Sequence, residues 1–232
     1  MPRQPSGEQY HRLKESLNLK KSWTLWEWWV GVMAIAELIG LGIVFIAGAI
    51  INALGTESAV AVFHITGLLE GLVLGMAQWL VLHRYVKHIK AWVVVTAIAV
   101  MIAWLIGLQI SALMVFPMIL NTTLTAAMKA QTLLKGVFLL GAWVGAVLGF
   151  AQWLVLRAHI HRAALWIAAN ALAWALGLVV AFMMVSMIHT SPFSLATAFA
   201  GAATGLITGA VIGAITGVAL LWLLKPRLLR RD

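Results

Sequence analysis

Cysteine is missing from this chain, and charged residues and prolines are scarce. None of the 232 residues is cysteine, which excludes disulfides, thiolate metal sites and cysteine-ligated iron–sulfur clusters. Charged side chains make up only 10% of the chain, well below the share found in soluble domains. The five prolines lie outside the long apolar runs or at their ends, so no predicted helix carries a proline kink.

Hydrophobic residues dominate instead. They make up 63% of the chain, and the mean hydropathy is +0.99, which is typical of membrane proteins. Six apolar runs are long enough to cross a hydrocarbon core of about 30 Å as helices. They cover residues 25–51, 59–83, 91–116, 132–156, 164–189 and 195–224. The sequence therefore predicts an all-α polytopic membrane protein, with a single six-helix transmembrane domain over residues 23–232.

The basic residues predict an orientation in the membrane. Fourteen of the sixteen Lys and Arg residues lie in the two chain ends and in the segments after the second and fourth runs. Because basic segments stay on the cytoplasmic side, both termini are predicted to be cytoplasmic. Residues 1–22 are predicted to form a basic tail, either disordered or a short helix lying on the membrane surface. The formal charge of +9 sits in these flanking clusters, so the expected partners are the lipid bilayer and other membrane subunits, not nucleic acid.

Aromatic and capping residues mark the ends of the runs. Thr24 and Glu27 have the spacing of a capping box that would open the first helix. Tryptophans cluster near the predicted boundaries, where amphipathic rings favour the headgroup level. These tryptophans are Trp23, Trp26, Trp28, Trp29, Trp79, Trp92, Trp153, Trp166 and Trp222.

An internal repeat organises the apolar runs. The stretch GLVLGMAQWLVLHR at 71–84 returns 74 residues later as GAVLGFAQWLVLRA at 145–158, and GAVIGAITGVAL at 209–220 is a weaker third copy. Repeats of this size indicate a duplicated structural unit. We expect three parallel helical hairpins, over about 25–83, 91–156 and 164–224, related by a pseudo-threefold axis along the membrane normal.

Each copy carries glycines at four-residue spacing and one polar residue on the same face. The glycines are Gly67, Gly71, Gly75, Gly141, Gly145, Gly149, Gly205, Gly209 and Gly213. Since such ridges let helices approach closely, the second, fourth and sixth runs are predicted to contact one another at a common axis. Gln78, Gln152 and Thr216 should meet there near the cytoplasmic end, either as hydrogen-bonded packing or as the girdle of a pore or ligand site.

Two carboxyl groups lie near the middle of predicted spans. Glu37 in the first run and Glu70 in the second have no basic partner within any run. An ionised group at the bilayer centre costs about 2.5–3.5 kcal/mol on insertion scales. The two residues are therefore either a proton or cation site or neutral glutamic acids bonded to backbone carbonyls. Val144 replaces Glu70 in the second copy. This difference between the copies is expected if a function was added to one copy of a repeated scaffold.

Histidine is the other candidate ligand. His64 lies inside the second run, and His159 and His161 follow the fourth. They are either interfacial side chains or ligands of a pigment or a metal. A pair of histidines without a third ligand is a weak pattern, so no metal site is predicted. No nucleophile and base motif is present, so no enzymatic activity is predicted.

The repeated motif G-x-x-x-G-x-x-Q-W-L-V-L resembles that of polytopic membrane proteins from bacteria such as cyanobacteria. It rests on Gly71, Gly75, Gln78, Trp79, Gly145, Gly149, Gln152 and Trp153. The resemblance covers the second to sixth runs. It implies a bacterial inner (plasma) membrane or a photosynthetic membrane, and no particular activity.

Two functions follow from these patterns. The first is a non-enzymatic accessory or assembly subunit of a membrane complex, which binds an apolar ligand such as a pigment, a quinone or a lipid. The alternative is a carrier or channel for a small solute, coupled to protons or cations through Glu37 and Glu70.

Overall fold

The structure is a computed structural model that describes residues 7–55, 57, 59–87, 89–110, 123, 125–187 and 195–228. Over these residues the chain forms six α-helices and no strand. The helices are α1 (Gly7–Leu54), α2 (Ala59–Leu82), α3 (Ala91–Ile110), α5 (Ala126–Leu156), α6 (Leu165–Ser186) and α7 (Leu195–Leu228). The prediction of an all-α chain is confirmed.

Five of these helices are long and apolar enough to span a membrane: α1, α2, α5, α6 and α7. The sixth, α3, has a shorter apolar stretch, Ala91–Gly107. The last residues of the predicted third span, 111–116, lie outside the described residues. The long apolar helices expected from hydropathy are therefore present, because length and apolar composition are local properties of each run.

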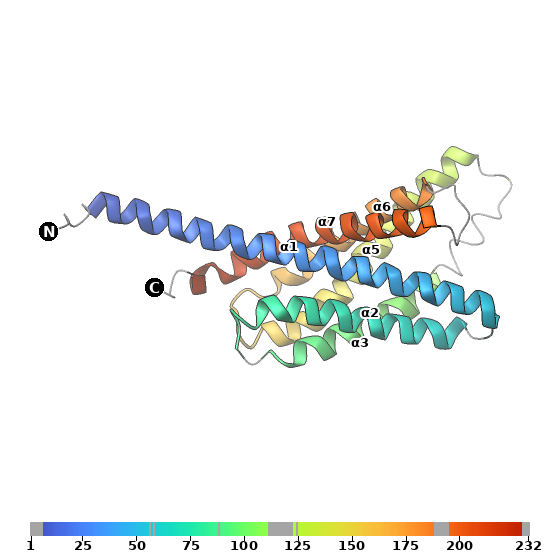
Figure 1. Cartoon of the computed structure of the whole chain (residues 1–232), viewed down its shortest axis with the longest axis horizontal. Coiled ribbons are helices and arrows are strands. Elements are labelled where there is room, and N and C mark those ends of the chain that lie inside the picture. The colour runs from blue at the N-terminus through green and yellow to red at the C-terminus, as the bar shows by residue number, and fades with distance from the viewer. Residues whose placement is uncertain are drawn as a thin grey trace.

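The helices pack as a closed ring. Each of the six described helices packs mainly against two others, in the order α1, α2, α3, α5, α6, α7 and back to α1. Figure 1 shows the start of α1 and the end of α7 on the left, where the described residues between α2 and α3 and between α5 and α6 also lie. We call this the near end. The turn from α1 to α2 at Gly55 lies at the opposite, far end (Figure 1).

The glycine ridges decide which helices pack most closely. Gly71 of α2 lies against α3, where an added Cβ would be 2.6 Å from the Ala97 Cα. Gly145 of α5 lies against the Asn170 carbonyl of α6, and Gly209 of α7 against the Met33 carbonyl of α1. Three glycine-packed pairs result, namely α2 with α3, α5 with α6, and α7 with α1.

This arrangement corrects the predicted common contact of the second, fourth and sixth runs. The glycines of α2, α5 and α7 do not face one another, since each ridge faces the neighbouring helix. The close pairs also differ from the hairpins predicted over 25–83, 91–156 and 164–224. The same ridge at Gly67, Gly71 and Gly75 could fit any helix that presents small residues, so the periodicity alone did not identify its partner.

The N-terminal segment does not form a separate unit from residue 7 onward. One helix, α1, runs without a break from Gly7 to Leu54, and Figure 1 shows its first turns projecting beyond the ring. Thr24 lies within it and donates through Oγ1 to the Lys20 carbonyl at 3.0 Å. The predicted capping box with Glu27 is therefore wrong, because the helix begins before it. Residues 1–6 of the predicted tail lie outside the described residues.

Candidate ligand-binding site inside the helix ring

A hydrogen-bonded layer fills the ring toward its near end. Its members are Trp29, Trp92, Trp166, Gln78, Gln152 and Thr216, and we call them the tryptophan layer. In each glycine-packed pair an indole N–H donates to the polar residue of the glycine helix. The Nε1–Oε1 distances are 3.0 Å from Trp92 to Gln78 and 2.8 Å from Trp166 to Gln152. In the third pair, Trp29 Nε1 lies 2.9 Å from Thr216 Oγ1.

The two glutamines also join the pairs to one another. Gln152 Nε2 donates to Gln78 Oε1 at 2.8 Å and to Thr96 Oγ1 at 3.1 Å. Gln78 Nε2 reaches the sulfur of Met33 in α1 at 3.5 Å. Each glutamine therefore contacts the tryptophan helix of its own pair and that of the preceding pair. Buried amides satisfied in this way fix the register of neighbouring helices.

The tryptophan layer is closely packed and excludes water. The three indoles are 0% exposed and the three polar side chains at most 1%. The rings of Trp29 and Trp166 pack edge to face with centroids 5.9 Å apart. Trp29, Trp92 and Trp166 are therefore not exposed rings of an aromatic belt, contrary to the prediction. Other predicted belt residues, such as Trp23 and Trp222, are 60% and 47% exposed, as interfacial rings should be.

A second layer lies eight residues, or about 12 Å, toward the far end of each helix. Its members follow the tryptophans by eight residues and precede Gln78, Gln152 and Thr216 by eight. Its members are Glu37, Val100 and Trp174 on the tryptophan helices and Glu70, Val144 and Thr208 on the glycine helices. We call it the cavity layer. It places two carboxyl groups, an indole and a hydroxyl at positions where the three pairs differ. This chemical difference separates it from the tryptophan layer, in which every pair makes the same tryptophan bond.

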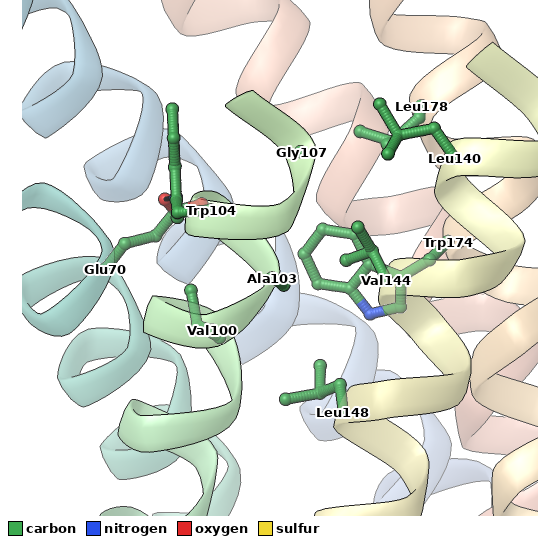
Figure 2. Close-up of a pocket in the computed structure, with 10 residues that line it drawn as sticks. All are labelled: Glu70, Val100, Ala103, Trp104, Gly107, Leu140, Val144, Leu148, Trp174 and Leu178. Carbon is green, nitrogen blue, oxygen red and sulfur yellow. Dashed lines mark hydrogen bonds between the residues drawn. The ribbon is translucent and has the colours of Figure 1, made fainter. Parts of the chain in front are cut away.

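A cavity of about 260 Å³ lies beside this layer, between α3 and α5. Its wall consists of Glu70, Val100, Ala103, Trp104, Gly107, Leu140, Val144, Leu148, Trp174 and Leu178. Figure 2 shows the Val100 side chain on α3 and the Leu148 side chain on α5, with the Trp174 ring overlapping Val144 in this view. The lining is almost wholly apolar, with a few polar atoms, which is the usual composition of a pocket for a small organic molecule.

Glu70 is held at one side of the cavity. Its Oε2 accepts a hydrogen bond of 2.6 Å from Trp104 Nε1. Its aliphatic stem passes close to Gly40 of α1, where an added Cβ would lie 3.2 Å from Glu70 Cγ. Glu37 lies three residues before Gly40 on the same helix and is buried, with 6% exposure. The two predicted intramembrane carboxyl residues are thus on adjacent helices, and Glu70 alone lines the cavity.

Two buried polar atoms near this layer have no partner among the described residues. They are the indole Nε1 of Trp174 and the Oγ1 of Thr208. Trp174 lies on the cavity wall and is 6% exposed, while Thr208 is 3% exposed. Buried donors are almost always paired, and an unpaired one costs about 1–3 kcal/mol. The tryptophan layer leaves no such atom among its described side chains.

The histidines lie apart from the cavity. His64 and His159 each bond through Nδ1 to a backbone carbonyl one turn earlier in their own helix. His161 is an exposed residue of the near-end loop. The described residues hold no group of three or more His, Asp or Glu that could bind a metal.

Sequence reasoning named part of this site and missed the rest. Gln78, Gln152 and Thr216 lie in one layer, and Glu70 lines the cavity. Trp104 and Trp174 were not predicted as site residues, although both lie on the cavity wall. The fourteen-residue spacing from each glutamine to the next tryptophan was a usable signal for the bonds in the tryptophan layer. No comparable spacing marks the cavity.

The comparisons with known proteins found no match. No protein-family model matches the chain, and no curated protein or solved structure is similar to it.

Proposed function

We propose that this chain is a non-enzymatic integral membrane protein that binds a small, mostly apolar molecule inside its helix ring. We place it in a bacterial inner membrane or a photosynthetic membrane, as an accessory or assembly subunit. The cavity between α3 and α5 carries the proposal, because its apolar wall and few polar atoms match those of small-molecule sites. A quinone ring or a short lipid segment suits this volume.

The tryptophan layer supports binding over conduction. A pore along the ring axis would have to pass six side chains that are at most 1% exposed. Opening it would break the Trp–Gln bonds and leave buried donors unpaired. We therefore assign Gln78 and Gln152 to packing and not to a pore girdle.

We also infer a pseudo-threefold arrangement, with a repeat unit different from the predicted hairpin. Each unit runs from a glycine helix to a tryptophan helix, so that α2–α3 and α5–α6 are continuous units. The third unit joins α7 to α1 across the chain ends, with the same tryptophan bond from Trp29 to Thr216. The glycine contacts of the three pairs support this assignment.

The near end is the cytoplasmic end in this proposal. Arginines of its loops lie over tryptophan rings, with 5.9 Å from Arg84 to Trp28 and 5.7 Å from Arg162 to Trp222. Such pairs suit a basic, headgroup-facing surface. Since the chain has no cysteine, a single Lys87→Cys or Lys129→Cys variant reports sidedness directly. A membrane-impermeant thiol reagent applied to intact cells should label Cys at 129 and not at 87, and the reverse pattern would overturn the orientation.

The proposed function is tested by filling the cavity. Val144→Trp adds bulk at the cavity wall, whereas Leu139→Trp adds the same group at a 67% exposed position of the same helix. Mass spectrometry of extracts from purified protein should find a small molecule with the wild type and with Leu139→Trp. It should be missing from Val144→Trp. Equal amounts in all three samples, or none in the wild type, would contradict the proposal.

A second candidate is the proton- or cation-coupled carrier. The observation in its favour is the position of Glu37 and Glu70 on adjacent helices, with Glu70 on the cavity wall. Liposomes with the wild type and with the Glu37→Gln/Glu70→Gln double variant distinguish the two functions. Binding alone predicts no flux above that of empty liposomes, whereas a carrier predicts flux that the double variant loses.

A further inference from the structure

A second hollow lies on the outer surface of the ring, between α5 and α6. It has a volume of about 450 Å³, and we call it the outer groove. Its lining residues are Leu134, Lys135, Phe138, Leu139, Leu176 and Val179. Five of these are apolar, and four of the five are exposed. The outer groove shares no lining residue with the cavity between α3 and α5, so it is a separate site.

Lys135 is the charged residue of this groove, and it lies at the depth of the lipid headgroups. It precedes Leu156, the last residue of α5, by 21 residues, which corresponds to about 32 Å along the helix. No charged residue lies between Lys135 and Arg157, and a bilayer core is about 30 Å thick. Lys135 therefore marks the far boundary of the apolar stretch, and Phe138 and Leu139 lie one turn deeper.

The described part of the chain gives Lys135 no counter-charge. Lys135 makes no ion pair and no hydrogen bond with another described residue, and neither α5 nor α6 contains an aspartate or a glutamate. A lysine at this depth lays its stem on apolar surface and keeps its ammonium group at the headgroup level. The groove thus combines an apolar floor with one unneutralised cation at its outer end. An anionic phospholipid has the complementary chemistry, a negative headgroup above an acyl chain.

We propose that the outer groove binds one anionic phospholipid, whose phosphate contacts the Lys135 ammonium group and whose acyl chain lies against Phe138 and Leu176. A zwitterionic phospholipid has the same phosphate, but its own cation lies close by and weakens the attraction to Lys135. An apolar helix of another protein would cover the groove and leave Lys135 without a counter-charge. The proposal concerns a different site from the proposed function, so either can fail without the other.

Since the chain has no cysteine, a single fluorophore can report on this groove. Gln131 is exposed and lies one turn before Lys135 on the same face of α5. Gln131→Cys with a thiol-linked fluorophore is reconstituted in phosphatidylcholine vesicles. Phosphatidylglycerol or phosphatidylcholine with a nitroxide near the ester end of one acyl chain is then added as the quencher. We expect phosphatidylglycerol to associate roughly threefold to fivefold more strongly, as one exposed ion pair allows.

Variants in the labelled protein then assign the contacts. Lys135→Gln should associate equally with the two lipids, whereas Lys135→Arg keeps a cation and should keep the preference. Lys129→Gln removes a cation of the same helix outside the groove and should leave the preference unchanged. Leu139→Trp adds bulk to the groove and should weaken quenching by both lipids. Val144→Trp, in the wall of the other cavity, should not.

Three results would overturn the lipid site. The first is equal association of both lipids with the labelled protein that has Lys135. The second is a preference that survives in Lys135→Gln or disappears in Lys129→Gln, because the total charge of the far end would then set it. The third is unchanged quenching in Leu139→Trp, which would put the lipid outside the groove. None of these results bears on the molecule expected to co-purify in the cavity between α3 and α5, so the two proposals fail separately.

Discussion

The tryptophan layer and the cavity layer lie about 12 Å apart in the same ring. They differ in hydrogen bonding and in how alike the three helix pairs are. In the first, each of three tryptophans bonds to a polar residue of its partner helix, and all six side chains are buried. In the second, Glu70 stands where the next pair has Val144, and Trp174 and Thr208 leave donors unpaired. A cavity adjoins this layer.

The difference separates structure from function within one scaffold. Polar groups that recur in all three pairs satisfy one another, and this is how buried polar groups stabilise a fold. In the cavity layer, Trp174 Nε1 and Thr208 Oγ1 have no such partner among the described residues, and burying them costs free energy. Sites that depart from local consistency are the expected places for function. The following predictions break or sharpen this contrast, from the largest expected effect to the smallest.

The glycine contacts should be the most sensitive to substitution. In Gly71→Ala the new Cβ would lie 2.6 Å from the Ala97 Cα of α3, so the helices must separate. We expect a loss of about 3 kcal/mol in the free energy of unfolding, at the upper end for overpacking. Unfolding in a denaturing detergent titration measures it. Gly136→Ala is the control, because nothing lies within 4 Å of its added Cβ, and alanine should leave stability equal or slightly higher.

The tryptophan layer should depend on its amides. Gln152→Leu removes the acceptor of the Trp166 N–H and the donor to Gln78. Because the Trp166 donor stays buried, we expect a loss of about 2 kcal/mol in the free energy of unfolding. The double variant Gln152→Leu/Trp166→Phe also removes the unpaired Trp166 N–H donor. The double variant should then lose less than the sum of the two single changes, and strict additivity would contradict the assigned bond.

Glu70 should matter for stability only through its bond to Trp104. Glu70→Leu leaves the Trp104 N–H without its acceptor. We expect a loss of about 1 kcal/mol in the free energy of unfolding, measured by thermal unfolding. Glu70→Gln keeps an acceptor oxygen in the same place and should stay within about 0.5 kcal/mol of the wild type. A larger loss in Glu70→Gln than in Glu70→Leu would show that the carboxyl group has a structural role beyond this bond.

Trp174 should contribute least to stability. Its N–H has no partner to lose among the described residues, so Trp174→Phe should change the free energy of unfolding by less than about 1 kcal/mol. Thermal unfolding of ligand-free protein measures this change. A loss as large as that of Gln152→Leu would mean that Trp174 belongs to the structural framework, and the contrast between the layers would then fail.

Some of this site could be predicted because the signals are local. Helical periodicity puts Gly71 and Gln78 on one face, since seven residues make nearly two turns. The repeat puts Gln152 and Thr216 at the same level, and the structure brings Gln152 to within 2.8 Å of Gln78. Trp29, Trp92 and Trp166 were misplaced because an indole near a helix end suits the membrane surface and a buried amide equally well.

The sequence by itself determined that the chain forms long apolar helices and which residues share a helix face. These properties depend on composition and on spacing along one segment. Only the tertiary structure decided which helix each glycine face meets, that α7 closes the ring onto α1, and that a cavity lies between α3 and α5. Lipid gives helices no hydrophobic drive to associate, so side-chain fit between distant segments selects their partners, and that fit is not visible in one run of sequence.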